Sequence, residues 1–433
     1  MTAPSASPPP GGIVSDLPIA SGSRLATRLN AWGADARVRE DFDNAAAAYE
    51  AAQWAVPGNP GPTSNLAEVL IHRGLHAEGV AAAELACRID PDVAEVWYGL
   101  GKSLLSAGDA EAAIAALSEA LRIDPNHMPA MHNLAICCLA TGRLEAGWSA
   151  YRWRATVAHR TDVPRVPIPA GWKGRVVVAC EQGLGDVLFF ARWLPVLREK
   201  GAEEIWCAWP TKIAPLMRRA FPDVLEGFGD DGCVDVRMGD LPYLTQTPGP
   251  LPSIVVRAND DPFMAILPER AVKRPMIGVT WRAGAPTRKY GLDKKIDPEW
   301  ILGALEKVGG NIATMQRGAP SVEDVVAHIE SRIRRKRHWN WNSLSDDPET
   351  VLDILPFLNV YVTVSNTNVH LLAALPPDQR PKCHVLVTYP PELRWMHEGD
   401  ESPWFPGIRV HRQKPDGSWP ADMVQRIVED IRA

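Results

Sequence analysis

A short glycine-rich turn is the first place in this sequence where chemistry could occur. Gly183-Leu184-Gly185-Asp186 follows the apolar run Arg175–Cys180 and precedes a long apolar segment, which predicts a turn from a strand into a helix. Backbone amides at such a helix end can bind an anion, and Asp186 could either cap the helix or act as a base. A dinucleotide fingerprint would need glycine in place of Leu188, so a nicotinamide or flavin site is disfavoured.

Polar residues also follow strand-like segments farther along the chain. Met276–Trp281 is predicted to be a strand, and the cations after it are Arg282, Arg288, Lys289, Lys294 and Lys295. Gln316 ends another predicted strand. The run Ser365-Asn366-Thr367-Asn368-Val369-His370 contains good N-cap residues and is predicted to open a helix. Instead of forming a site, each of these side chains could be a solvated loop cation or a structural polar group.

The first third of the chain repeats a helical pattern with a period of 34 residues. Pro57, Pro91 and Pro125 each close one unit. A small residue recurs where two helices should cross, at Ala45, Gly79, Ala113 and Gly147. The units resemble tetratricopeptide repeats, which implies four copies over residues 24–160, stacked as an α-solenoid whose groove binds a protein. A role only as a spacer or dimerisation element is the alternative.

The composition is that of an ordinary globular protein. The chain has 433 residues, 46% hydrophobic and 23% charged, with a formal net charge of −6, so no nucleic-acid partner is expected. The cationic run Arg332–Arg337 could be a solvated helix end or a phosphate-binding patch. No secretory signal and no apolar run long enough to span a membrane is present. We therefore expect a cytoplasmic protein with a disordered lead at residues 1–23.

Beyond a proline-rich linker at residues 161–173 the pattern changes to strands that alternate with helices. The predicted strands are Arg175–Cys180, Glu204–Trp209, Met276–Trp281, Asn311–Gln316, Asn359–Ser365 and Cys383–Thr388. The predicted helices in the second half are Pro298–Val308, Ser321–Ile329, Pro348–Leu355, Thr367–Leu375 and Ala421–Arg432. Apolar strands alternating with helices predict parallel sheets covered on both faces. We expect two α/β units, at residues 174–255 and 274–433.

Five segments of these units carry a more specific resemblance. In chain order they are EQGLGDVLFFARWLPVL, IGVTWRAG, TMQRG, VSNTNVHLLAAL and RWMHEGDESPWFPGIRVHRQ. From about Gly174 the chain resembles the glycosyltransferase domain of bacterial tetratricopeptide-repeat proteins related to the ADP-heptose:lipopolysaccharide heptosyltransferases. It is more distantly similar in plan to the O-GlcNAc transferases. The resemblance implies a GT-B fold, in which two Rossmann-like lobes hold a nucleotide-sugar donor in the cleft between them.

The resemblance also implies roles for individual residues. Asp186 matches the position of the catalytic aspartate, and Lys295 lies where the family often has a cation. The implied donor-binding residues are Gly183, Gly185, Trp281, Arg282, Lys295, Gln316, Ser365, Asn366, Thr367 and His370. No metal or other cofactor is expected, because the Asp-x-Asp spacing of metal-dependent transferases occurs only inside the repeats, at Asp41-Phe42-Asp43 and Asp90-Pro91-Asp92.

The sequence departs from the heptosyltransferases where they usually carry Asp-Thr and this chain has Ser365-Asn366. ADP-heptose is therefore not the expected donor. We predict an inverting, metal-independent transferase that moves a sugar from a nucleotide sugar to a protein recruited by the repeats. The alternatives are a non-catalytic adaptor with a decayed transferase domain, and a transferase that acts on a lipid-linked glycan. The sequence does not indicate an oligomeric state.

Overall fold

The computed structural model describes residues 19–154, 166–230, 232–259, 274–283, 294–306, 310–316, 338–389, 392–414 and 417–432. The predicted helix Ser321–Ile329, the cationic run Arg332–Arg337, the cations Arg288 and Lys289, most of the predicted lead and residues 161–165 of the predicted linker lie outside these ranges. The chain divides into two compact units, one ending at Cys137 and the other beginning at Cys138.

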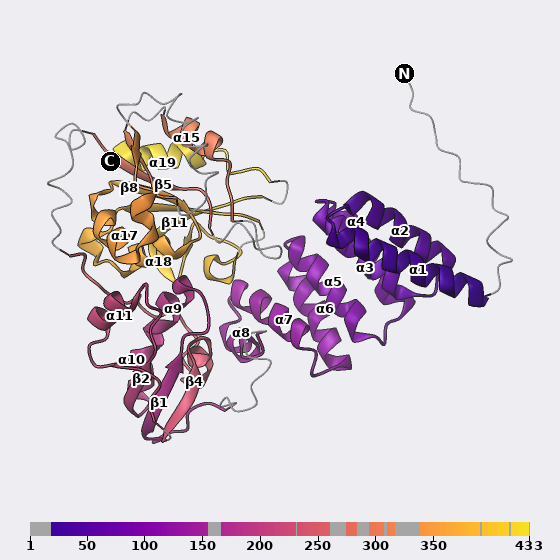
Figure 1. The fold of residues 1–433 in the computed structure, drawn as a ribbon, viewed down its shortest axis with the longest axis horizontal. Coiled ribbons are helices and arrows are strands. Elements are labelled where there is room, and N and C mark those ends of the chain that lie inside the picture. The colour runs from indigo at the N-terminus through magenta and orange to yellow at the C-terminus, as the bar shows by residue number, and fades with distance from the viewer. Residues whose placement is uncertain are drawn as a thin grey trace. The chain divides into compact units, whose positions relative to one another are not determined.

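Antiparallel helical hairpins make up the described part of the first unit (Figure 1). The helices are α1 (Ile19–Val38), α2 (Phe42–Ala55), α3 (Pro60–His72), α4 (His76–Ile89), α5 (Ala94–Ser106), α6 (Ala110–Ile123) and the start of α7 (Met128–Ala140). Ala45 and Ala113 are fully buried at the helix crossings. A Cβ atom on Gly101 of α5 would lie 2.5 Å from Cγ of Leu117 on α6. The repeated small residues are therefore required by the close approach of paired helices.

The helix α8 (Leu144–Tyr151) belongs to the second unit. Trp148 packs edge-on against Phe190, with ring centroids 5.8 Å apart, and its Nε1 donates a hydrogen bond to the Pro248 carbonyl at 2.9 Å. These contacts make α8 part of the α/β core, although it continues the helical pattern of the repeats.

The first lobe of the second unit is a four-stranded parallel sheet. Its strands are β1 (Gly174–Ala179), β2 (Ala202–Cys207), β3 (Leu225–Glu226) and β4 (Cys233–Arg237), in the order β3-β2-β1-β4. Its helices are α9 (Leu184–Phe190), α10 (Leu194–Glu199), α11 (Ala214–Ala220) and α12 (Leu241–Leu244). A 3₁₀ turn at Ala191–Trp193 separates α9 from α10. Pro195 favours this break because proline cannot donate a hydrogen bond to the carbonyl of residue 191.

The second lobe is a seven-stranded sheet in the order β10-β11-β9-β8-β5-β6-β7. Its strands are β5 (Met276–Thr280), β6 (Asn311–Thr314), β7 (His338–Asn340), β8 (Val360–Val364), β9 (Lys382–Val387), β10 (Glu401–Ser402) and β11 (Phe405–Arg412). All neighbours are parallel except β10 and β11. Its α-helices are α15 (Pro298–Glu306), α17 (Pro348–Ile354), α18 (Thr367–Ala374) and α19 (Met423–Arg432). The predicted fold class, helical repeats followed by two parallel α/β lobes, is confirmed.

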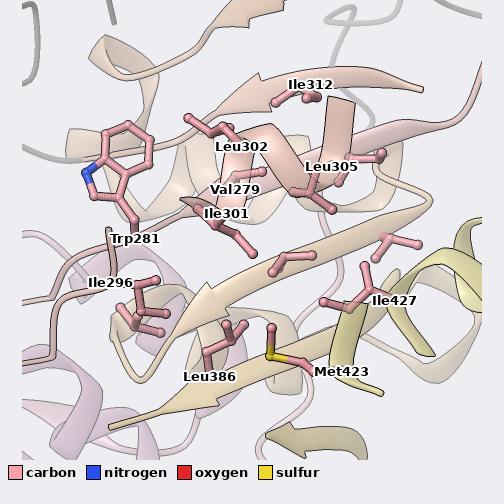
Figure 2. Packing of buried hydrophobic residues seen from close by; sticks show 14 of the residues in the cluster. Val279, Trp281, Ile296, Ile301, Leu302, Leu305, Ile312, Leu386, Met423 and Ile427 are labelled. Atoms are coloured by element: carbon pink, nitrogen blue, oxygen red, sulfur yellow. The ribbon is translucent and has the colours of Figure 1, made fainter. Parts of the chain in front are cut away.

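One face of this sheet forms a large apolar core with α15 and α19. Ile277, Val279 and Trp281 occupy alternate positions along and just beyond β5, and all three are buried in this core. Met423 and Ile427 of α19 lie four residues apart and are also fully buried. Figure 2 shows Trp281 near Leu302 of α15, and Met423 near Leu386 of β9. Every second residue of a strand, and residues four apart in a helix, lie on the same face. This spacing accounts for which side chains enter the core.

Buried hydrogen bonds connect the two lobes. Arg192, in the turn after α9, donates from Nη1 to the carbonyls of Leu251 at 2.9 Å and Trp404 at 3.0 Å. Burial lowers the pKa of Arg192 to about 9. Val256, in the segment that leaves the first lobe, donates its amide to the Ala374 carbonyl at the end of α18 at 2.8 Å. None of the described helices combines the length and apolarity required to cross a bilayer.

Candidate functional site

A hollow of about 450 Å³ opens between the two lobes of the second unit, a size typical of small-molecule sites, which span roughly 300–1,000 Å³. Helix α18 of the second lobe lies against α9 of the first (Figure 1), and residues of both helices line this hollow. The described residues that line it are Gly183, Leu184, Gly185, Asp186, Thr280, Arg282, Ala283, Lys294, Met315, Gln316, Ser365, Asn366, Thr367, Asn368, His370 and Arg394. Eight of the ten predicted donor-binding residues, and Asp186, are therefore brought to one place by the fold.

Asp186 lies in the first turn of α9, and both of its carboxylate oxygens have partners. Oδ2 accepts a hydrogen bond from the Gly183 amide at 3.2 Å, which is a helix-capping contact. Oδ1 is paired with Nη2 of Arg394. The sequence left open whether Asp186 caps the helix or acts as a base. The structure shows the cap, together with a cation on the second oxygen.

Arg394 is a charged lining residue that the sequence analysis did not select. It lies in a 3₁₀ turn, Leu393–Trp395, and is 8% exposed. Its guanidinium carbon lies 4.9 Å from the ring centroid of Phe189. The segment RWMHEGD is part of the resemblance, but no local sequence pattern predicts which distant residue Arg394 contacts. Asp186 is 208 residues away in the sequence.

Lys294 lines the hollow, and Lys295, the predicted cation, does not. An isolated antiparallel bridge pairs Lys295 with Arg282, so this segment is extended. Side chains alternate along an extended chain. Lys295 is exposed, whereas Nζ of Lys294 is 2.7 Å from Oε1 of Glu392. The cation that lines the hollow is therefore Lys294, the residue next to the predicted Lys295.

Trp281 lies outside the hollow, whereas Gln316 lines it as predicted and also makes hydrogen bonds to the backbone. Trp281 belongs to the apolar core and does not line the hollow (Figure 2). The side-chain oxygen of Gln316 accepts from the amides of Trp281 at 3.2 Å and Arg282 at 2.9 Å, and its Nε2 donates to the Arg282 carbonyl at 3.1 Å. Gln316 thus lines the hollow while it holds the backbone that presents Arg282.

Asn366 caps α18 as predicted. Its Oδ1 accepts from the amides of Asn368 at 2.9 Å and Val369 at 3.3 Å. These two backbone amides at the start of α18 are therefore already hydrogen-bonded within the protein. Below this turn, the hydroxyl of Tyr361 lies 2.8 Å from Oγ1 of Thr280 and accepts from Nδ2 of Asn368 at 3.0 Å. Buried Tyr361 thereby ties the start of α18 to the end of β5.

His370 lies one turn into α18 and is 5% exposed. Burial, with the nearby charges of Arg192 and Lys294, lowers its pKa to about 3. Its ring packs edge-on against Phe405, with centroids 5.2 Å apart. Its buried Nδ1 has no hydrogen-bond partner among the described residues. At neutral pH this side chain is an uncharged donor or acceptor, so it can hydrogen-bond a ligand but adds no positive charge.

Comparisons with known proteins identify the repeats. Family models described as tetratricopeptide repeat match residues 30–94 and 104–147. Among curated proteins, Protein FlbA of Caulobacter vibrioides is 29% identical over 192 residues, which are 41% of this chain and 32% of FlbA. The match therefore spans about a third of the length of that relative.

Among solved structures, MamA is 24% identical, covering 31% of this chain and 74% of MamA, with a TM-score of 0.28. The Sgt2 TPR domain from Aspergillus fumigatus is 26% identical, covering 25% of this chain and 74% of that domain, with a TM-score of 0.25. A mutant of the O-GlcNAc transferase of Thermobaculum terrenum is 14% identical, covering 95% of this chain and 93% of that chain, with a TM-score of 0.34. At these TM-scores the likenesses carry no argument about activity.

Proposed function

We propose that this protein is an inverting, metal-independent glycosyltransferase that moves a sugar from a nucleotide-sugar donor to a protein acceptor. The observation that carries the proposal is the interlobe hollow, where a carboxylate, three cations and the capped start of a helix meet. Those cations are Arg282, Lys294 and Arg394. Sugar transfer needs this combination: a base for the acceptor hydroxyl and positive charge for the departing diphosphate.

Each part of the hollow has a task in this mechanism. Arg282 and Lys294 neutralise the diphosphate, and the N-terminus of the eight-residue helix α18 adds a favourable dipole. His370, neutral and buried, supplies one hydrogen bond to the donor through its unpartnered Nδ1 or through Nε2. Asp186 accepts the proton of the acceptor hydroxyl as that oxygen attacks the anomeric carbon from the side opposite the diphosphate. One displacement of this kind inverts the configuration.

The helical repeats recruit the acceptor in this proposal. Tetratricopeptide repeats bind other proteins through the groove of the stacked hairpins, and family models match residues 30–94 and 104–147. A sugar acceptor held by the repeats would gain a high effective concentration at the transferase lobes of the same chain. A lipid-linked glycan as acceptor would need no such array.

The purified full chain and a panel of nucleotide sugars test the proposal. Donor turnover and the intact mass of candidate acceptor proteins are measured for the wild type, Asp186→Asn and Asp186→Ala. Asparagine keeps an oxygen that can accept the Gly183 amide but cannot accept a proton, so both variants should lose turnover while Asp186→Asn stays folded. Failure of every nucleoside diphosphate and nucleotide sugar to bind the wild type in calorimetry would refute the transferase.

A non-catalytic adaptor is the second candidate, and one observation favours it. Both oxygens of Asp186 already have partners within the protein, so neither oxygen is open to an acceptor hydroxyl in this arrangement. An adaptor would bind a protein partner and give no sugar transfer with any donor. Nucleotide-sugar binding without turnover, together with tight partner binding, would support it.

A further inference from the structure

We propose that Arg394 exchanges Asp186 for the diphosphate of the donor, so that donor binding itself frees the carboxylate to act on the acceptor. This inference deepens the proposed function and rests on it. Arg394 would be both a donor-binding residue and the residue that keeps Asp186 inactive in the empty protein.

Arg394 is held in place by its own turn. Its carbonyl accepts a hydrogen bond from Oγ of Ser402, and the neighbouring Trp395 is fully buried. The guanidinium packs over Phe189 and reaches the lining of the hollow. The backbone is therefore anchored while the charged group lies beside the space that a ligand would fill.

The buried charge of Arg394 requires a counter-ion. Arginine stays protonated in proteins, and a buried charge is costly unless an opposite charge and hydrogen bonds compensate it. Asp186 supplies the direct contact. Another carboxylate oxygen, Oε2 of Glu392, is 3.6 Å from Nη1, and Oε1 of Glu392 is held at 2.7 Å by Lys294. Among the described residues that line the hollow, Lys294 and Arg394 are therefore each paired with a carboxylate of the protein itself.

A bound diphosphate would compete with Asp186 for Arg394. It carries more negative charge than a single carboxylate and presents several oxygens to the planar guanidinium, which binds such groups through two parallel hydrogen bonds. When Arg394 turns to the diphosphate, Asp186 keeps only the hydrogen bond from the Gly183 amide. The oxygen that faced Arg394 becomes available to the acceptor hydroxyl.

The reaction that follows is balanced without a further reagent. The acceptor O–H bond breaks and its proton moves to Asp186, while the acceptor oxygen forms a bond to the anomeric carbon. The bond from the anomeric carbon to the phosphate oxygen breaks, and its electron pair leaves with the nucleoside diphosphate. Arg394 stabilises that leaving charge at the same moment. In the empty protein the base stays engaged, so proton transfer depends on the presence of the donor.

A double-mutant cycle on nucleoside diphosphate binding tests the exchange. ADP, UDP and GDP are titrated by calorimetry into the full-length wild type, Asp186→Asn, Arg394→Gln and the double variant. If Asp186 competes for Arg394, Asp186→Asn should bind the preferred diphosphate several-fold more tightly, and Arg394→Gln about tenfold more weakly. The double variant should match Arg394→Gln, because the carboxylate has no arginine to compete for. Arg426→Gln, which alters an exposed arginine on α19 outside the hollow, is the control.

The outcomes separate this inference from the proposed function. If the wild type binds a diphosphate but Asp186→Asn binds no more tightly, the exchange is wrong and the transferase stands. If the wild type binds none of the three, both fail. Hydrogen exchange of the wild type gives a measurement that needs no variant: added diphosphate should change protection at the start of α9 and at Leu393–Trp395. Unchanged protection in both segments would also contradict the exchange.

Discussion

Gly185 and His370 approach each other so closely that a side chain at position 185 would press against the His370 ring. A Cβ atom on Gly185 would lie 3.0 Å from Cδ2 and 3.2 Å from Nε2 of His370. Gly185 belongs to α9 in the first lobe and His370 to α18 in the second. The glycine of the turn therefore allows the close contact between the two lobes.

Replacing Gly185 with alanine should disturb the hollow more than the fold. The added methyl group must displace the buried ring of His370 by a few tenths of an ångström, and overpacking of this kind costs about 1–3 kcal/mol. We expect several-fold weaker nucleoside diphosphate binding in calorimetry and a small drop in melting temperature. Gly303→Ala in α15 is the control, because nothing lies within 4 Å of its Cβ position. Wild-type affinity in Gly185→Ala would show that the contact is irrelevant to binding.

The two adjacent lysines should differ in their effect on donor binding. Lys294 lines the hollow, and Lys295 is exposed on the other side of the extended segment. Loss of one charge-assisted contact typically costs about 1.4 kcal/mol or more, which is a tenfold change in affinity. Lys294→Ala should therefore weaken diphosphate binding about tenfold, and Lys295→Ala should leave it within about twofold. The reverse order in calorimetry would mean that the segment has a different register in solution.

Arg154 is a buried cation whose loss should destabilise the second unit. It pairs with both Glu181 and Asp240, and all three side chains are less than 10% exposed. Burial alone would lower the pKa of Arg154, but these two carboxylates raise it. Arg154→Met leaves two buried acids without a cation, so we expect a loss of about 3–5 kcal/mol in urea unfolding.

Two comparisons test the origin of that loss. The triple variant Arg154→Met, Glu181→Gln, Asp240→Asn removes the buried charges together and should recover part of the stability. Arg175→Met breaks a surface pair with Asp230, in which the side chains are 36% and 61% exposed, and should cost far less stability because solvent screens such a pair. Equal losses for Arg154→Met and Arg175→Met would rule out the buried cluster as a source of stability.

Two buried histidines should make the second lobe sensitive to acid. Nδ1 of His384 lies 3.0 Å from Nε2 of His411, and Nε2 of His384 lies 3.2 Å from Asp430. Lys382 and Arg409 also face Asp430. Burial lowers the pKa of His384 to about 3 and of His411 to about 4, whereas an unfolded histidine titrates near 6.5.

Because the unfolded chain binds protons first, stability should fall as the pH drops from about 6.5 toward 4. Each histidine can contribute up to about 2 kcal/mol of this loss at pH 5. Thermal unfolding at pH 7.5, 6.0 and 5.0 measures the effect. The double variant His384→Gln, His411→Gln should lose less stability between these pH values than the wild type. An identical pH dependence would assign the acid sensitivity to other groups.

The sequence alone determined the helical repeats, the apolar strands at the centre of each sheet and the edge where those strands end. Buried parallel strands are continuous apolar runs, so β1, β5, β8 and β9 were predicted within one or two residues at each end. Residues that follow such strands meet at one edge of the sheet. The resemblance placed Asp186, Arg282, Gln316 and Ser365–Thr367 in one cleft, and these residues do line one hollow.

Only the tertiary structure decided what each side chain does in that hollow. Because side chains alternate along an extended segment, Lys294 lines the hollow and Lys295 does not. For the same reason Trp281 lies on the side of β5 that faces the apolar core. The division of the chain at Cys137 and Cys138 assigned α8 to the α/β unit, because its aromatic side chains pack there. Above all, Arg394 meets Asp186 across 208 residues. Local patterns of period two or four carry no information about such a contact, which depends on how two separate lobes pack.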